Sequence, residues 1–278
     1  GRFYVDLYAR AHKRGGAWMD DCKSRRELAN GDIQYPVAYL TCNLNKPIGD
    51  KPALFTHDEV VTLFHEFGHG IHHMLTQIDT SVVSGIDGVP WDAVELPSQF
   101  LENWCWQPEA LAFISGHYQT GEPLPQAMLD KMLAAKNYQS AMQMLRQLEF
   151  SIFDFKMHKD YQPAQDNSGY IQQTLNQVRE EYSVLNAADF NRFQHGFGHI
   201  FGGGYSAGYY SYKWAEVLSA DAFSRFEEEG IFNPKVGNDF LTNILEKGGS
   251  QEPSVLFKAF RGREPEIDAL LRHCGIEG

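Results

Sequence analysis

Apolar residues recur every three or four positions along most of this chain, which is the spacing that one buried face of a helix requires. The best-marked helix is predicted to begin after Thr56, because Thr56 and Glu59 have the spacing of a capping box. Its apolar face is formed by Val60, Leu63, Phe64, Phe67, Ile71 and Leu75.

Strand-like patterns are confined to the first part of the chain. Residues 3–8 form one candidate strand, and residues 37–44 form a better one that a turn at residues 45–47 closes. Further helices are expected at residues 97–115, 125–135, 138–159, 168–184, 206–228, 239–247 and 265–274. With no internal repeat and no convincing linker, we predict a mainly α fold with a small β-sheet, and one domain over residues 1–278.

The composition of the chain limits the classes of function that are possible. The chain is 43% hydrophobic and carries a net charge of −12, so it is expected to be globular and not to bind nucleic acid. No apolar run approaches the roughly 18 residues of a membrane span, so no membrane partner is expected. Four cysteines lie far apart and are expected to stay free thiols. The chain begins without Met, at residues that look like part of a strand, so we expect it to be a piece of a longer protein.

His65-Glu66-Phe67-Gly68-His69 is an HExxH pattern within the best-marked helix. Residues four apart share a helix face, so the two imidazoles can converge on one zinc ion. Glu66 is rotated away from His65, which lets its carboxylate reach a water molecule without binding the metal. We therefore predict one Zn²⁺ per chain, with Glu66 as the general base.

A catalytic zinc needs a third protein ligand, and Glu95 is our choice. It follows a glycine-bearing loop and precedes Pro97, which suits the first turn of a helix. Asp92 and Glu102 are competing carboxylates. Glu102 lies two turns beyond Glu95, where it could instead orient a ligand histidine. His72 is expected beside the site, and His73 at the surface or in the packing, because four imidazoles on one zinc would close the site.

These motifs together resemble the thimet-oligopeptidase family of zinc peptidases. The resemblance rests on residues 65–72, on residues 95–104 and on residues 199–212, and it extends to residues 6–18 and to the ending at residues 260–266. It spans essentially the whole chain and is much more specific than HExxH alone. The three consecutive glycines at 202–204 are similar to those of bacterial members.

The resemblance implies a zincin-like endopeptidase that hydrolyses short unstructured peptides in the cytoplasm, and we expect a monomer. It also implies that a large N-terminal helical portion of the family is absent from this chain. No Ser or Cys sits in a recognisable nucleophile arrangement, so direct attack by water, with Glu66 moving the proton, is the expected mechanism.

Tyr205, Tyr209 and Tyr212 are spaced to share one helical face. The resemblance makes Tyr212 and Tyr209 the best donors, to the oxyanion or to the substrate backbone, and His199 is a second donor candidate. We expect Tyr212 and His199 to be catalytic and Tyr205 and Tyr209 to bind substrate. Gly203 and Gly204 are also expected to bind substrate. The conformational freedom of the glycine backbone would let this segment close on substrate.

Three alternatives stay open. The strand at residues 37–44 is either an exposed edge that pairs with an extended peptide or an interior strand. The enzyme could be a dipeptidyl carboxypeptidase, which needs a cationic group for the free carboxylate that the sequence does not place. A non-catalytic peptide-binding module with a structural zinc would leave Glu66 without a purpose.

Overall fold

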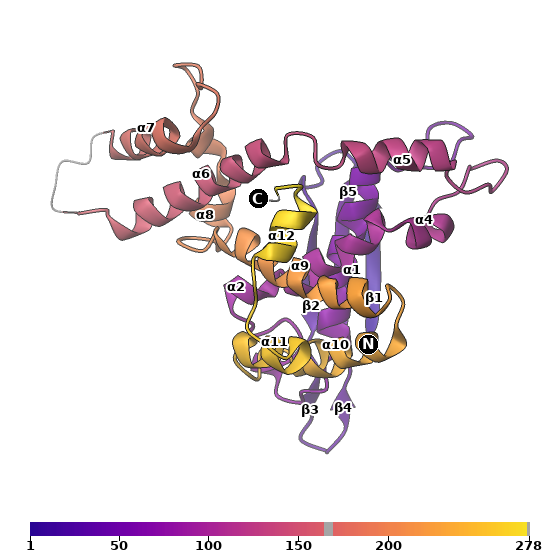
Figure 1. Cartoon of the computed structure of the whole chain (residues 1–278). Helices are drawn as coiled ribbons and strands as arrows, with labels where there is room; N and C mark the ends of the chain where they lie inside the picture. Colours follow the sequence, from indigo (N-terminus) through magenta and orange to yellow (C-terminus); the bar gives the residue numbers. More distant parts are fainter. Residues whose placement is uncertain (164–168, 277–278) are drawn as a thin grey trace.

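A computed structural model of the chain describes residues 1–163 and 169–276. A three-stranded sheet stands beside one long helix (Figure 1). The strands are β1 (Arg2–Tyr8), β2 (Trp18–Lys23), β3 (Arg26–Glu27), β4 (Ile33–Gln34) and β5 (Val37–Leu44). The mainly α fold with a small sheet is thus confirmed.

The α-helices are α1 (His57–Leu75), α2 (Trp91–Val94), α3 (Leu96–Glu102), α4 (Pro108–Ile114), α5 (Gln126–Ala135), α6 (Ser140–Lys159), α7 (Tyr170–Tyr182), α8 (Gly198–Gly202), α9 (Ser211–Glu229), α10 (Pro234–Asn243), α11 (Pro253–Arg261) and α12 (Asp268–His273). Short 3-10 helices lie at η1 (Ser81–Val83), η2 (Asn103–Trp106), η3 (Phe193–Gly196) and η4 (Leu245–Lys247).

The sheet has the order β1-β5-β2, so β5 is the central strand. It pairs in parallel with β1, where Tyr4 lies opposite Tyr39, and antiparallel with β2, where Asp20 lies opposite Tyr39. The possibility that residues 37–44 form an exposed edge is therefore wrong. The sequence pattern does not reveal β2, because its two adjacent aspartates are unusual in a strand.

Helix α1 begins where the capping box predicts. The Thr56 hydroxyl accepts a hydrogen bond from the Glu59 amide, and the Glu59 carboxylate accepts one from the Thr56 amide. The same carboxylate also accepts from the amide of Asn45, which follows β5. The cap therefore fixes both the start of α1 and its position beside the central strand.

Three other predicted helices differ from the structure. The helix expected at residues 97–115 is divided into α3, η2 and α4. The ring of Pro108 and its missing N–H prevent a helix from continuing through this residue. The helix expected at 206–228 begins only at Ser211. The helix expected at 239–247 instead begins at Pro234, capped by the Asn233 side chain. In the helix expected at 168–184, Ser168 lies outside the described residues.

Two aromatic cores hold the helices together. The larger joins α3, α9, α10 and α11, and in it Phe100 stacks on Phe240 with ring centroids 4.0 Å apart. The smaller joins α6, α7 and α8, and includes Phe153, Phe197 and Tyr209. Helices α6 and α7 lie side by side and project from the body of the molecule (Figure 1).

Within the described residues no helix is both long and apolar enough to cross a membrane. All four cysteines are free, as expected; Cys42 and Cys105 are buried and Cys22 is exposed.

Candidate active site

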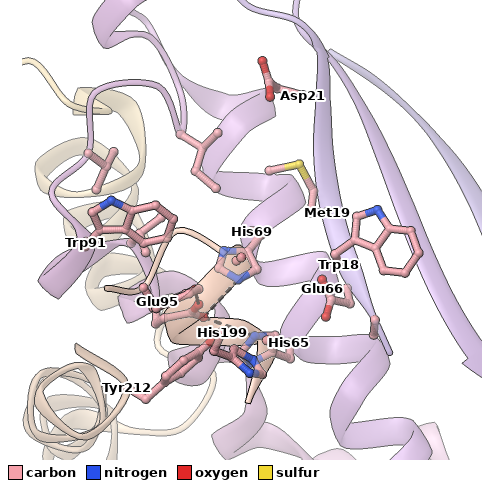
Figure 2. Close-up of a pocket in the computed structure, with 18 of the residues that line it drawn as sticks. Trp18, Met19, Asp21, His65, Glu66, His69, Trp91, Glu95, His199 and Tyr212 are labelled. Carbon is pink, nitrogen blue, oxygen red and sulfur yellow. Dashed lines mark hydrogen bonds and ion pairs between the residues drawn. The ribbon is translucent and has the colours of Figure 1, made fainter. Parts of the chain in front are cut away.

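The two histidines of the HExxH pattern lie on one face of α1, with ring centroids 5.0 Å apart. Their Nε2 atoms both approach the Oε2 atom of Glu95, at 3.2 Å from His65 and 3.0 Å from His69. Among the described residues these three form a group that could hold a metal ion. Figure 2 shows the Glu95 side chain directed toward the two histidines.

Close packing of α1 on α3 brings these groups together. Gly68, between the two histidines, has no side chain, and a Cβ there would lie 2.5 Å from the Pro97 carbonyl oxygen and from Ser98 Cα. Real Cβ contacts do not occur at that distance, so glycine is required for the approach. Glu95 stands directly before α3, as its N-cap residue. Gly68 therefore sets how near Glu95 comes to the histidines.

Both oxygens of Glu95 are held in place. The Ser98 hydroxyl donates to Oε2 over 2.9 Å, and the Tyr205 hydroxyl donates to Oε1 over 2.7 Å. Glu95 is only 3% exposed. Burial alone would raise the pKa of Glu95, but the nearby His69 and His65 hold it well below the usual range. The carboxylate is therefore kept charged.

Glu102 contacts His65 on the other side of the ring. Its Oε1 atom lies 2.6 Å from His65 Nδ1, so it accepts that proton and leaves Nε2 facing Glu95. Burial alone would lower the pKa of His65, but the bonds to Glu102 and Glu95 raise it to about 10. The site thus strongly favours a positive charge. Asp92, the other competing carboxylate, lines a separate hollow.

Glu66 points into the same cleft without joining this group (Figure 2). It is 4% exposed, and its Oε2 atom has no hydrogen-bond partner among the described residues. Burial raises the pKa of Glu66. A buried carboxylate with a free oxygen and a raised pKa is suited to accept and release a proton.

His72 and His73 do not reach this group. His72 is 3% exposed, and burial lowers its pKa to about 3. Its Nδ1 atom has no partner among the described residues, and the side chain lines a small pocket apart from the cleft. His73 is fully buried, and its Nε2 atom donates to the Lys23 carbonyl, which ties α1 to the end of β2. Both residues are packing neighbours of the site.

Tyr205 and Tyr209 lie in the segment that joins α8 to α9, and Tyr212 is the second residue of α9. Tyr205 and Tyr212 stack with ring centroids 4.9 Å apart, and both line the cleft. Burial, and to a smaller extent the negative charge of Glu95, raise the pKa of Tyr212, so its phenol stays protonated and can donate a hydrogen bond. His199 also lines the cleft, 6.0 Å from the Tyr212 ring between centroids.

The expected shared helical face of the three tyrosines is wrong, because residues 203–210 are not helical and Ala207 has a φ of 54°. Tyr209 is 8% exposed and packs in the smaller aromatic core, where its hydroxyl donates to Gln147 over 3.1 Å. It is not among the residues that line the cleft. Its substrate-binding role stays a prediction that this arrangement does not favour.

The glycines of the segment differ in position. Gly203 lines the cleft. Gly204 has a φ of 88°, and a Cβ there would lie 3.2 Å from the Trp91 ring. The backbone thus turns against an aromatic wall that the sequence did not indicate.

The cleft itself has a volume of about 990 Å³. One wall is β2, an edge strand of the sheet, from which Met19 and Asp21 face the cleft (Figure 2). An edge strand presents unpaired backbone groups that can pair with an extended chain. No sequence motif indicated the strand β2, so this wall of the cleft was not predicted.

The residues fit a zinc ion. Ligand atoms about 2.0–2.1 Å from one zinc at tetrahedral angles lie roughly 3.3 Å apart, close to the separations found here. The carboxylate on His65 Nδ1 is the usual outer partner of a metal-binding histidine. The donor set of two imidazoles and one carboxylate also leaves a fourth position for water, as catalytic zinc sites do.

Comparison with known proteins gives consistent matches. The family model "Peptidase family M3" matches residues 1–276. The chain is 66% identical over 278 residues to oligopeptidase A of Salmonella typhimurium, covering all of this chain and 41% of that protein. It is 35% identical to the dipeptidyl carboxypeptidase of Escherichia coli, covering 99% of this chain and 40% of that protein. The solved structure of PZ peptidase A superposes with a TM-score of 0.62 at 16% identity, covering 98% of this chain and 42% of that one.

Proposed function

We propose, from the premise that this chain belongs to peptidase family M3, that it carries the zinc-dependent catalytic centre of an oligopeptidase acting on short peptides. The family that the motifs predicted is confirmed. The chain spans about two fifths of the length of the relatives compared, so substrates and activity are proposed for the protein that contains it. We further propose one catalytic domain over residues 1–278, a cytoplasmic location, as the resemblance implies, and a monomeric protein.

One observation carries the proposal. Two histidine Nε2 atoms and one Glu95 oxygen converge in a large cleft, beside a Glu66 carboxylate oxygen that has no partner among the described residues. A structural zinc site would need a fourth protein ligand and would have no use for Glu66. The arrangement therefore favours catalysis over a peptide-binding module.

Bound zinc would polarise the scissile carbonyl and make water more acidic. Glu66 would take a proton from the attacking water and give it to the leaving amine. Tyr212, and His199 as a second donor, would donate hydrogen bonds to the oxyanion. Tyr205 would hold Glu95 through its hydroxyl. The free edge of β2 would bind the peptide backbone, which gives affinity with little dependence on side chains.

The test is hydrolysis of internally quenched peptides of about 5 to 15 residues by the full-length protein. Activity should disappear with a chelator and return when zinc alone is added back. Hydrolysis that a chelator leaves unchanged would refute the proposal, and so would a zinc-loaded protein that cleaves no peptide of any length.

A second candidate is the removal of C-terminal dipeptides, and one observation favours it. Arg14, which precedes β2, lines the cleft and stacks over the Trp18 ring at 5.3 Å, so a cation is available for a free carboxylate. If this activity dominates, peptides with an amidated C-terminus would be poor substrates, and Arg14→Gln would raise KM only for peptides with a free one. Equal cleavage of both kinds of peptide favours the endopeptidase.

A further inference from the structure

Asp154 is a buried carboxylate that no part of the proposed mechanism uses. It lies on α6, is 0% exposed, and faces the segment that carries the active-site tyrosines. Its Oδ1 atom accepts a hydrogen bond from the Ala207 amide and its Oδ2 atom one from the Tyr209 amide, both over 2.9 Å. We infer that Asp154 is a positioning residue, which sets residues 203–212, the tyrosine segment, over the proposed metal site.

The tyrosine segment needs such an anchor because it has little regular structure of its own. Residues 203–210 of it are bends and turns between α8 and α9, and Ala207 has a φ of 54°, which an alanine rarely adopts. Its two inward amides have no helix or sheet partner, and a buried amide without a partner is costly. Asp154 supplies both acceptors from one side chain.

A carboxylate is the side chain suited to this position. Only a carboxylate accepts at both terminal oxygens, and hydrogen bonds to a charged acceptor are about twice as strong as neutral ones. Burying that charge is unfavourable unless it is fully paired. Among the described residues, its further partner is His158 on the same helix, whose Nδ1 lies 2.9 Å from Asp154 Oδ1.

The anchored segment leads directly to the site. Just before the anchored amides, the Tyr205 hydroxyl donates to Glu95 over 2.7 Å. Just after them, Tyr212 stacks on Tyr205 at the start of α9. No residue of α6 lines the cleft, so Asp154 can act on the reaction only through this segment. This inference rests on the proposed function, because it takes the two phenols to work there.

A merely structural role is the competing explanation, and Glu149 is the matched control. It is on the same helix, is 1% exposed, and accepts hydrogen bonds from Arg146 and Arg179. The bond from Arg179 ties α6 to α7, the bond from Arg146 lies within α6, and neither is made to a residue of the tyrosine segment. Loss of this carboxylate should therefore lower stability while leaving the tyrosines in place.

The experiment compares Asp154→Asn with Glu149→Gln in the full-length, zinc-loaded protein. Asparagine keeps the size of aspartate but presents an NH₂ group to one of the two amides. Because a misplacement of about 1 Å can cost on the order of 100-fold, we expect kcat to fall roughly 10- to 100-fold with KM changed less than about threefold. Glu149→Gln should keep kcat within about twofold.

Hydrogen exchange gives a second readout that does not depend on activity. Amides of residues 207 and 209 should exchange faster in Asp154→Asn and at the wild-type rate in Glu149→Gln. Faster exchange with unchanged kcat would overturn the inference, because the position of the segment would then not matter. Equal losses of kcat in both variants would overturn it too.

Asp154→Glu is a second variant in case the asparagine protein does not fold. It keeps the charge and moves the carboxylate by one methylene, so kcat should again fall more than KM rises. If both Asp154 variants failed to fold while Glu149→Gln folded, the residue would serve the fold and not the site. A wild-type protein that cleaves no peptide would refute the proposed function, whereas the exchange rates would still test the anchor.

Discussion

Glu102 is predicted to strengthen zinc binding although it does not point at the metal. Its carboxylate accepts the His65 Nδ1 proton over 2.6 Å, which forces the opposite nitrogen, Nε2, to carry the lone pair that a metal needs. Removing the carboxylate leaves the ring free to rotate and to exchange tautomers. The perturbation is therefore Glu102→Gln and Glu102→Ala, with zinc affinity as the quantity measured.

The magnitude follows from the kind of hydrogen bond. A bond to a charged group contributes about 1.5–3 kcal/mol and a neutral one about 0.5–1.5 kcal/mol. Glutamine can still accept, so Glu102→Gln should lose about 1 kcal/mol or less, which is up to roughly fivefold in zinc affinity. Alanine loses the whole bond, and Glu102→Ala should weaken zinc binding by about 10- to 100-fold. The Glu102 side chain is 32% exposed, so water can replace part of the bond and the lower end of that range is expected.

The assay is competition for zinc against a fluorescent chelator of known affinity, which needs no peptide hydrolysis. Asp92→Asn is the control, because Asp92 is a nearby carboxylate that lines a different hollow. We expect wild type and Asp92→Asn to bind zinc equally tightly, Glu102→Gln to bind it more weakly, and Glu102→Ala to bind it most weakly. A Glu102→Ala protein within twofold of wild type would refute the reasoning, as would an equal loss in Asp92→Asn.

Local signals made α1 predictable. The capping box depends on residues three apart, and the apolar face on residues three and four apart, so both can be found without knowing the tertiary structure. The orientation of His65 and His69 toward one side depends on the same short spacing. These were the parts of the site that the residues alone could indicate.

Features that depend on distant contacts were not predictable in the same way. The strand β2 is held by pairing with β5, and its own residues do not favour a strand. The tyrosine spacing suggested a helix, but Asp154 lies more than 50 residues away and holds two amides in a turn. Glu95 was chosen over Asp92 from its place before Pro97. The close approach of α3 at Gly68 is what brings the carboxylate to the histidines.

Three further predictions concern catalysis and acid stability. Glu66→Gln should keep bound zinc and lose most of kcat, because the proton acceptor is gone while the proposed ligands remain; near-normal turnover would exclude Glu66 as the base. Tyr212→Phe should lower kcat by about 10²–10³ with a much smaller change in KM, as loss of an oxyanion donor does; a change in KM alone would make the phenol a substrate-binding group. The last prediction concerns Asp221, a fully buried carboxylate on α9 that is far from this chemistry. Burial alone would raise the pKa of Asp221, but hydrogen bonds from Arg263, the Glu266 amide and Arg261 hold that pKa below its ordinary value of 3.8. As the pH falls, Asp221 is therefore protonated in the unfolded chain before it is protonated in the folded one. The stabilisation that its charge gives is complete above about pH 4 and is lost below it. Thermal unfolding of wild type and Asp221→Asn between pH 3 and 7 should show a difference in Tm that is largest near neutrality and shrinks below pH 4. A difference that stays constant across this range would show that the charge of Asp221 does not stabilise the fold.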